Sequence, residues 1–145
     1  MTTADHLDTI DRLRVREFPA EPDRSGGRSS GPGHHLVEVG RTGGCREDDG
    51  SAWIAASDQI SAEYGALTQA LSDRWGEPQV FALESLAVRA AEGEEIPEPW
   101  AEVSASTDHV QLWRAGDHWL VAYVTRGDAY DPYLLMAGVT VVDPP

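Results

Sequence analysis

The residues with the clearest potential for chemistry are five glutamates that lie close together in the second half of the chain. They belong to a segment that also contains Pro97, Pro99 and Trp100. The glutamates are Glu92, Glu94, Glu95, Glu98 and Glu102. Two carboxylates can catalyse acid–base chemistry when one of them is desolvated and the other is not. A proline-punctuated loop with closely spaced charges is instead typical of a solvated surface, so we expect a binding loop and not a catalytic pair.

The composition of this loop is that of a protein-recognition edge. Proline fixes φ and so reduces the entropy that binding must remove, while closely spaced carboxylates steer a basic partner toward the loop. Aromatic side chains dominate binding energy when they are exposed and fill the core when they are buried, and the sequence leaves both alternatives open for Trp100 and Trp113. The candidate partner-binding residues are Glu92, Glu94, Glu95, Glu98, Trp100, Glu102 and Trp113.

The histidines offer only a minimal metal site. His109 and His118 flank a predicted hairpin, where as cross-strand neighbours they would supply two ligands beside an aspartate. Solvated turn histidines explain the same pattern, so we expect no metal and no cofactor. The adjacent residues His34 and His35 would point to opposite faces of a strand.

A catalytic nucleophile is not indicated either. Cys45 lies between Arg41 and Arg46, which favour a thiolate, but the acidic residues 47–49 oppose this effect. The sequence contains no glycine-rich phosphate-binding motif and no Gly-x-Ser-x-Gly elbow. We therefore expect a protein that is not an enzyme.

The charge balance limits the classes of partner. The 145 residues include 25 acidic and 11 basic residues, all of the latter Arg, for a net charge of −14. Binding to nucleic acid or to an anionic membrane depends on Lys and Arg, so neither is expected. No apolar run approaches the ~20 residues of a membrane-spanning helix. The single cysteine permits no intrachain disulfide, which fits a reducing compartment, and we expect a cytoplasmic chain that is a monomer or a weak dimer.

The N-terminal part of the chain divides into a short helix and a connection. The apolar residues of 4–17 lie at helical spacing, which predicts a helix that Thr3 caps and Pro19 ends. Residues 19–33 are rich in Gly, Ser and Pro without periodic apolar residues, which predicts a flexible loop or linker. The predicted organisation is an N-terminal helix (1–18), this linker (19–33) and a single α+β domain (34–145).

The 34–145 domain is predicted to combine one main helix with an antiparallel sheet. An apolar stripe over residues 58–75 predicts the helix, and Gly76 and Pro78 end it. Strands are predicted over 35–39, 51–56 (or the opening of the helix), 79–83 with 86–90, 100–106, 108–114, 118–125 and 133–142. Turns of hairpin length pair strands antiparallel. We therefore expect an α+β fold with an antiparallel sheet of about five strands, one main helix packed on one face and a short N-terminal helix.

Three stretches carry a resemblance to known proteins. Residues 71–78 (LSDRWGEP), 92–102 (EGEEIPEPWAE) and the hairpin 112–122 resemble small uncharacterised actinobacterial proteins, which are similar in size and charge to bacterial toxin-immunity proteins. The likeness extends over roughly half of the chain and includes no catalytic motif. It implies a non-enzymatic domain that binds a basic protein partner, as an immunity-type inhibitor does. The alternative is a small-molecule-binding protein or minor enzyme with a pocket between sheet and helix.

Overall fold

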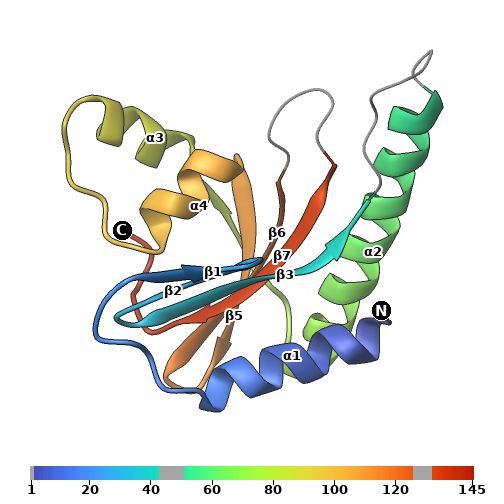
Figure 1. Ribbon diagram of the computed structural model, residues 1–145, viewed down its shortest axis with the longest axis horizontal. Coiled ribbons are helices and arrows are strands. Elements are labelled where there is room, and N and C mark those ends of the chain that lie inside the picture. The colour runs from blue at the N-terminus through green and yellow to red at the C-terminus, as the bar shows by residue number, and fades with distance from the viewer. Residues whose placement is uncertain (1, 43–50, 126–131) are drawn as a thin grey trace.

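The computed structural model contains a seven-stranded antiparallel sheet with helices on both of its faces (Figure 1). It describes residues 2–42, 51–125 and 132–145. The elements in chain order are α1 (Thr3–Val15), β1 (Asp23–Ser25), β2 (Arg28–Gly31), β3 (His34–Arg41), α2 (Ser51–Trp75), β4 (Gln79–Ala82), α3 (Glu84–Ala91), α4 (Trp100–Ser106), β5 (His109–Ala115), β6 (His118–Thr125) and β7 (Leu134–Thr140). The strand order is β1-β2-β3-β7-β6-β5-β4. The predicted α+β class is confirmed, but the sheet has seven strands instead of about five, and α3 and α4 cover the face opposite the main helix α2.

The first helix begins with a capping box. Thr2, and not the predicted Thr3, is the N-cap: its hydroxyl accepts the N–H of Asp5 at 3.2 Å, and the Asp5 carboxylate accepts the N–H of Thr2 at 2.8 Å. The helix packs Ile10 and Leu13 into the core that it shares with α2 and the sheet. α1 is thereby fixed to the sheet along its apolar side.

The segment 19–33, predicted as a flexible loop or linker, contains the two outermost strands on one side of the sheet. β1 and β2 form a hairpin whose turn is Gly26–Gly27, and Gly26 has φ 57°. A second turn at Pro32–Gly33, in which Gly33 has φ 93°, leads from β2 into β3. Both turns use the left-handed backbone region that favours glycine. Glycine and proline here mark turns between short polar strands, which is why the composition was misread as a linker.

The main helix is longer than predicted. α2 has 25 residues and includes 51–56, for which the sequence analysis favours a strand. This run contains three alanines, the residue with the highest helix propensity, and it continues without a break into the predicted helix. Gly76, with φ 93°, ends the helix and donates its N–H to the carbonyl of Ser72 at 2.8 Å. Ile60, Leu67 and Leu71 are buried, as the apolar stripe predicts.

Two further helices occupy segments that were predicted as strands. α3 replaces the strand predicted over 86–90, and α4 replaces the strand predicted over 100–106. The buried apolar residues at each helix are three positions apart, and they are Leu83 with Leu86 and Trp100 with Val103. This spacing is helical, because it places both residues on one side of the element. Apolar runs this short fit a strand and a helix equally well, so the periodicity alone could not decide between them.

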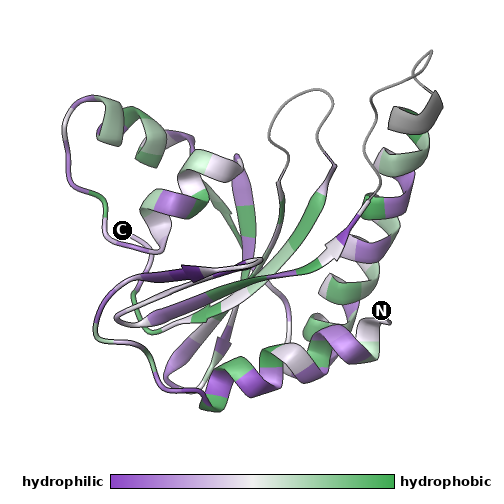
Figure 2. Ribbon diagram, viewed as in Figure 1, coloured by the Kyte–Doolittle hydropathy of each residue, from purple (hydrophilic) through white to green (hydrophobic). Residues whose placement is uncertain are grey.

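The two faces of the sheet carry separate hydrophobic cores. Successive residues of β6 alternate between them: Leu120 and Ala122 belong to the core under α1 and α2, and Val121 and Tyr123 to the core under α3 and α4. β6 is therefore covered on both sides. Figure 2 shows hydrophobic positions along these central strands. None of the helices in the described part of the chain has the length and apolar character that crossing a membrane requires.

The pairing of β3 with β7 joins the N-terminal and C-terminal halves of the sheet. In its register Leu36 lies opposite Gly138. A Cβ atom on residue 138 would lie 2.5 Å from the carbonyl oxygen of His35 and 2.6 Å from Cδ2 of Leu36. Only glycine permits this close approach of the two strands.

Substitution of Gly138 tests this constraint. We expect Gly138→Ala to lower the free energy of unfolding by about 3 kcal/mol, because the added methyl group meets a backbone carbonyl. Gly65→Ala is the matched control: nothing lies within 4 Å of the added Cβ, and an exposed helical glycine is replaced, so stability should rise by up to about 1 kcal/mol. Urea unfolding of both variants measures the difference. Equal stability of Gly138→Ala and the parent would mean that the two strands can separate without cost.

Candidate functional site

The acidic loop between α3 and α4 is only partly a free surface. The Glu94 carboxylate accepts a hydrogen bond from Nε of Arg89 at 2.7 Å, so its charge is already paired. The Glu98 carboxylate accepts the backbone N–H of Glu102 at 3.2 Å in the first turn of α4. Glu92 and Glu95 are exposed and have no ion-pair partner among the described residues. These two glutamates are therefore the ones that a partner can meet without displacing an internal contact.

Glu102 is a structural carboxylate. It accepts a hydrogen bond from Nη2 of Arg24 at 2.6 Å and another from the Ser29 hydroxyl at 2.8 Å, and its side chain is 19% exposed. Burial raises the pKa of Tyr123 far above its ordinary value, and the nearby Glu102 carboxylate raises it further. Glu102 thus ties α4 to the β1–β2 hairpin.

The two candidate tryptophans lie in the core. Trp100 is 0% exposed, and its Nε1–H donates to the carbonyl of Val142 at 3.1 Å. Trp113 is 1% exposed and lies in the other core, where its Nε1–H donates to the hydroxyl of Ser72 at 3.3 Å. Of the two alternatives that the sequence left open, the structure therefore supports core residues and not exposed anchors.

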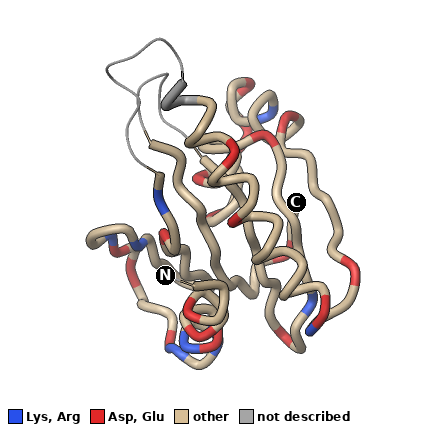
Figure 3. Tube along the Cα trace, turned by 90° about the vertical axis from the view of Figure 1, so that its right-hand side faces the viewer, with Lys and Arg blue, Asp and Glu red and all other residues tan. Residues whose placement is uncertain are grey.

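The layer that contains α3 and α4 is strongly acidic. Residues 84–108, which contain α3 and α4, include seven Asp or Glu residues and one basic residue, Arg89. Figure 3 shows acidic positions along much of the chain and fewer basic ones. Because Arg89 is already paired with Glu94, this layer offers a partner almost entirely negative charge.

A groove between α3 and the end of α4 lies in this acidic layer. We call it the α3–α4 groove; it has a volume of about 560 Å³, and its lining includes Leu83, Glu84, Ala87, Val88 and Asp108. Leu83 is fully buried, whereas the Val88 side chain is 56% exposed on α3. Glu84 and Asp108 are exposed and form no ion pair with any described residue. The groove therefore combines apolar surface with two free carboxylates.

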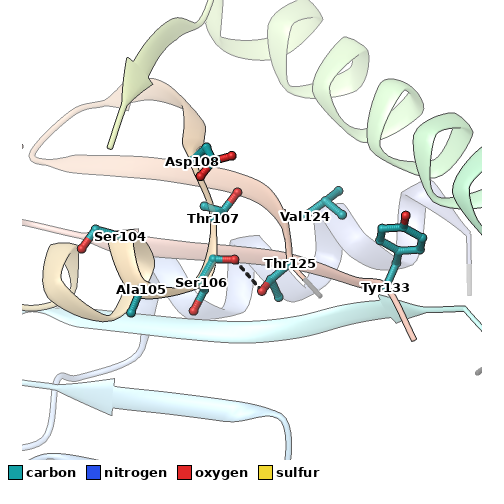
Figure 4. Close-up of a pocket in the computed structure, with 8 residues that line it drawn as sticks. All are labelled: Ser104, Ala105, Ser106, Thr107, Asp108, Val124, Thr125 and Tyr133. Atoms are coloured by element: carbon teal, nitrogen blue, oxygen red, sulfur yellow. Dashed lines mark hydrogen bonds between the residues drawn. The ribbon is translucent and has the colours of Figure 1, made fainter. Parts of the chain in front are cut away.

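A second cleft, of about 320 Å³, shares Asp108 with this groove and is rich in hydroxyl groups (Figure 4). The hydroxyl of Ser104 donates to the Ala101 carbonyl at 3.0 Å, and the Thr125 hydroxyl donates to the Ser106 carbonyl at 2.8 Å. An activated nucleophile needs an adjacent base, and these hydroxyl protons are instead held by backbone carbonyls. The Thr125 hydroxyl therefore connects β6 to α4, whereas the Ser104 hydrogen bond lies within α4.

His35 makes a contact that resembles a nucleophile–base pair but lies in the core. Its Nδ1 is 2.7 Å from the Ser30 hydroxyl, and its Nε2 is 3.1 Å from the carbonyl oxygen of Glu17. The carbonyl can only accept, which assigns the proton to Nε2 and leaves Nδ1 to accept from Ser30. Ser30 is 7% exposed and His35 is 1% exposed, and the ring of Phe18 lies 4.9 Å from that of His35. The pair fixes the chain that follows α1 to the sheet.

His34 lies on the opposite face of β3, as the alternation of the strand predicts. It is 4% exposed, and the carboxylates of Glu102 and Glu98 are its charged neighbours. Burial lowers the pKa of His34, while the two carboxylates oppose this shift in part. Burial also lowers the pKa of His35. Burial therefore favours the neutral form of both rings.

The histidines at the β5–β6 hairpin are not neighbours. His109 pairs with Ala82 on β4, and His118 pairs with Ala115 beside the turn, so the two lie at opposite ends of the hairpin. Of the two alternatives for these histidines, the arrangement as cross-strand neighbours is therefore not the one in the structure. Within the ranges that the structure describes, no three His, Cys, Asp or Glu residues are grouped so as to hold a metal ion. Cys45 lies outside the described residues.

Sequence analysis missed the residues that line the α3–α4 groove. Glu84, Ala87 and Val88 share one face only if residues 84–91 form a helix, and a strand was predicted there. The spacing of three and four positions between them was the signal that could have identified this face. A scan of family models finds no match to this chain, and searches of curated proteins and of solved structures find none either.

Removal of the Glu102 carboxylate tests its structural role. We expect Glu102→Ala to lower the free energy of unfolding by about 1–2 kcal/mol, because Ser29 and Arg24 lose a half-buried charged acceptor. Glu94→Ala is the control, since it breaks an exposed local pair and should cost less than about 0.5 kcal/mol. Urea unfolding measures both. A Glu102→Ala variant as stable as Glu94→Ala would show that α4 is held without this contact.

The buried histidines predict a pH dependence of stability. The unfolded chain takes up protons on His34 and His35 below about pH 6.5, but the folded chain, with its lowered pKa values, does so only at lower pH. The unfolded state then binds more protons, so the free energy of unfolding should fall as the pH is lowered from about 7 to about 5. His34→Gln should reduce this fall, and His109→Gln, at an exposed position, should leave it unchanged. An equal pH dependence of the parent and His34→Gln would contradict the assignment.

Proposed function

We propose that this chain is a non-enzymatic domain that binds a basic protein partner through its acidic α3–α4 layer, as an immunity-type inhibitor does. The observation that carries the proposal is the α3–α4 groove, in which exposed apolar surface lies beside the free carboxylates of Glu84 and Asp108. Glu92 and Glu95 extend the same negative surface along the neighbouring loop.

The groove suits a basic and partly apolar side chain. Val88 and Ala87 offer apolar contact to the aliphatic part of a Lys or Arg side chain, whose charged end can then reach a carboxylate. A charge-assisted hydrogen bond between these groups is short and strong. The α3–α4 groove therefore supplies the contact area that the sequence analysis assigns to Trp100 and Trp113, which are buried. The exposed glutamates keep their predicted role of steering a basic partner.

The net charge supports the same class of partner. A surface with a large excess of carboxylates attracts cationic proteins over a distance of about one Debye length, roughly 8 Å at physiological ionic strength. Such steering raises the rate of association more than it changes the lifetime of the complex. Glu84 and Asp108 line the α3–α4 groove and Glu92 and Glu95 are exposed on the neighbouring loop, so an approaching basic surface would be oriented toward α3 and α4.

Binding kinetics test the proposed function. The partner is a protein captured from native lysate by the full chain, and its association is measured with the parent and with the triple variant Glu84→Gln, Glu95→Gln, Asp108→Asn. These positions are chosen because Glu94 and Glu98 have internal partners. We expect association to slow by about tenfold at low salt and its salt dependence to become flatter. Val88→Ser should mainly speed dissociation.

A matched triple variant controls for net charge. Asp58→Asn, Glu21→Gln and Asp117→Asn remove the same charge at exposed positions outside the α3–α4 groove and its acidic layer. If this control slows association as much as the groove variant does, the groove is not the binding site. If neither variant changes the rate, the partner is not recognised by charge and the proposal fails.

A further inference from the structure

A groove on the other side of the sheet gathers basic residues. It lies between α1 and the β1–β2 turn, has a volume of about 580 Å³, and is lined by Arg12, Arg16 and Arg28 together with Leu13 and Val37. We call it the arginine groove. In a chain with a net charge of −14, three arginines that line one groove are a local reversal of sign.

The local geometry explains why these arginines converge. Arg12 lies in the last turn of α1 and Arg16 is the C-cap residue of the same helix, so both lie at its C-terminal end. Arg28 pairs with Val37 in the register of β2 and β3, and Val37 packs against the core under α1. Side chains that are paired across strands share a face, so Arg28 is directed to the side of α1.

The pairing of charges distinguishes these three arginines from the others. The described ranges contain nine arginines, of which six form ion pairs, namely Arg14, Arg24, Arg41, Arg74, Arg89 and Arg114. The remaining three, which have no ion pair within those ranges, all line the arginine groove. Glu38 also borders the groove, but its carboxylate already accepts from Nη2 of Arg41 at 2.7 Å.

The chemistry of the groove is that of an oxyanion site. Guanidinium groups present forked donors that match carboxylate and phosphate oxygens, and the apolar side chains of Leu13 and Val37 keep part of the groove away from water. The volume lies within the range of small-molecule sites, about 300–1,000 Å³. A long acidic polymer would meet the repulsion of the remaining negative surface, whereas a compact anion meets mainly the arginines.

We propose that the arginine groove binds a compact polyanion that carries phosphate or carboxylate groups. Tripolyphosphate and citrate serve as probes, and their binding to the full chain is measured by titration calorimetry at low salt. Saturable binding of either probe at one site supports the proposal, with shifts of the Gly26 and Gly27 amide signals in NMR spectra as the expected location. The tighter probe then assigns the ligand to the phosphates or to the carboxylates.

Arginine variants locate the site. Arg12→Gln, Arg16→Gln and Arg28→Gln should each weaken the binding by about tenfold or more, as expected for the loss of a charge-assisted hydrogen bond. Arg114→Gln removes the same charge outside the groove and should leave the affinity unchanged. Arg12 and Arg16 are exposed, so their variants should keep the fold and the test does not depend on Arg28 alone.

Two results would overturn the proposal. The first is no saturable binding of either probe; if an aspartate-rich peptide then binds, the groove belongs to an acidic protein segment. The second is an equal loss of affinity in Arg114→Gln, which would indicate a general effect of charge.

Discussion

The pairing of β3 with β7 is the constraint on which the rest of the structure depends. It brings together strands that are roughly a hundred residues apart, and closing so long a loop costs conformational entropy that burial must offset. Gly138 makes the close approach possible, and the strands on either side then form one continuous sheet. β3 contributes Val39 to one core and Leu36 to the other, so this pairing helps to build the surface on which each helix layer packs.

The β1–β2 hairpin adds polar connections to this frame. Its residues alternate between the faces, so Arg24 reaches Glu102 below α4 while Arg28 is directed toward α1. Ser29 and Ser30 also point to opposite faces: the Ser29 hydroxyl is bonded to Glu102 and the Ser30 hydroxyl to His35. A short strand pair without apolar residues thus links both helix layers, and it does so by hydrogen bonds instead of hydrophobic burial.

The parts of the fold that the sequence predicted correctly have long and regular patterns. The stripe of α2 and the β5–β6 hairpin repeat their period often enough to be read without tertiary information. The β1–β2 hairpin was missed because strands of three or four polar residues show no alternation of apolar and polar residues. The helices α3 and α4 were missed because one or two helical turns are too short to distinguish the helical period from that of a strand.

The candidate site also has features that the local sequence predicts and features that only the tertiary structure shows. Composition alone identified the acidic loop, since charge density is a local property of the sequence. The pairing of Arg24 with Glu102 joins residues 78 positions apart, and the burial of Trp100 depends on where α4 packs, so both required the tertiary structure. The residues that line the α3–α4 groove can be predicted only when residues 84–91 are correctly assigned as a helix.

The two grooves lie on opposite sides of the sheet and act over different distances. The carboxylates of the α3–α4 layer belong to a large net charge, which a basic protein senses before contact. The three arginines are surrounded by that negative field, so they act only on a ligand that has already entered their groove. An anion bound there would cancel the local positive charge and make the net charge of the molecule more negative. The two proposed sites would therefore reinforce each other electrostatically without any change in conformation, most strongly at low ionic strength.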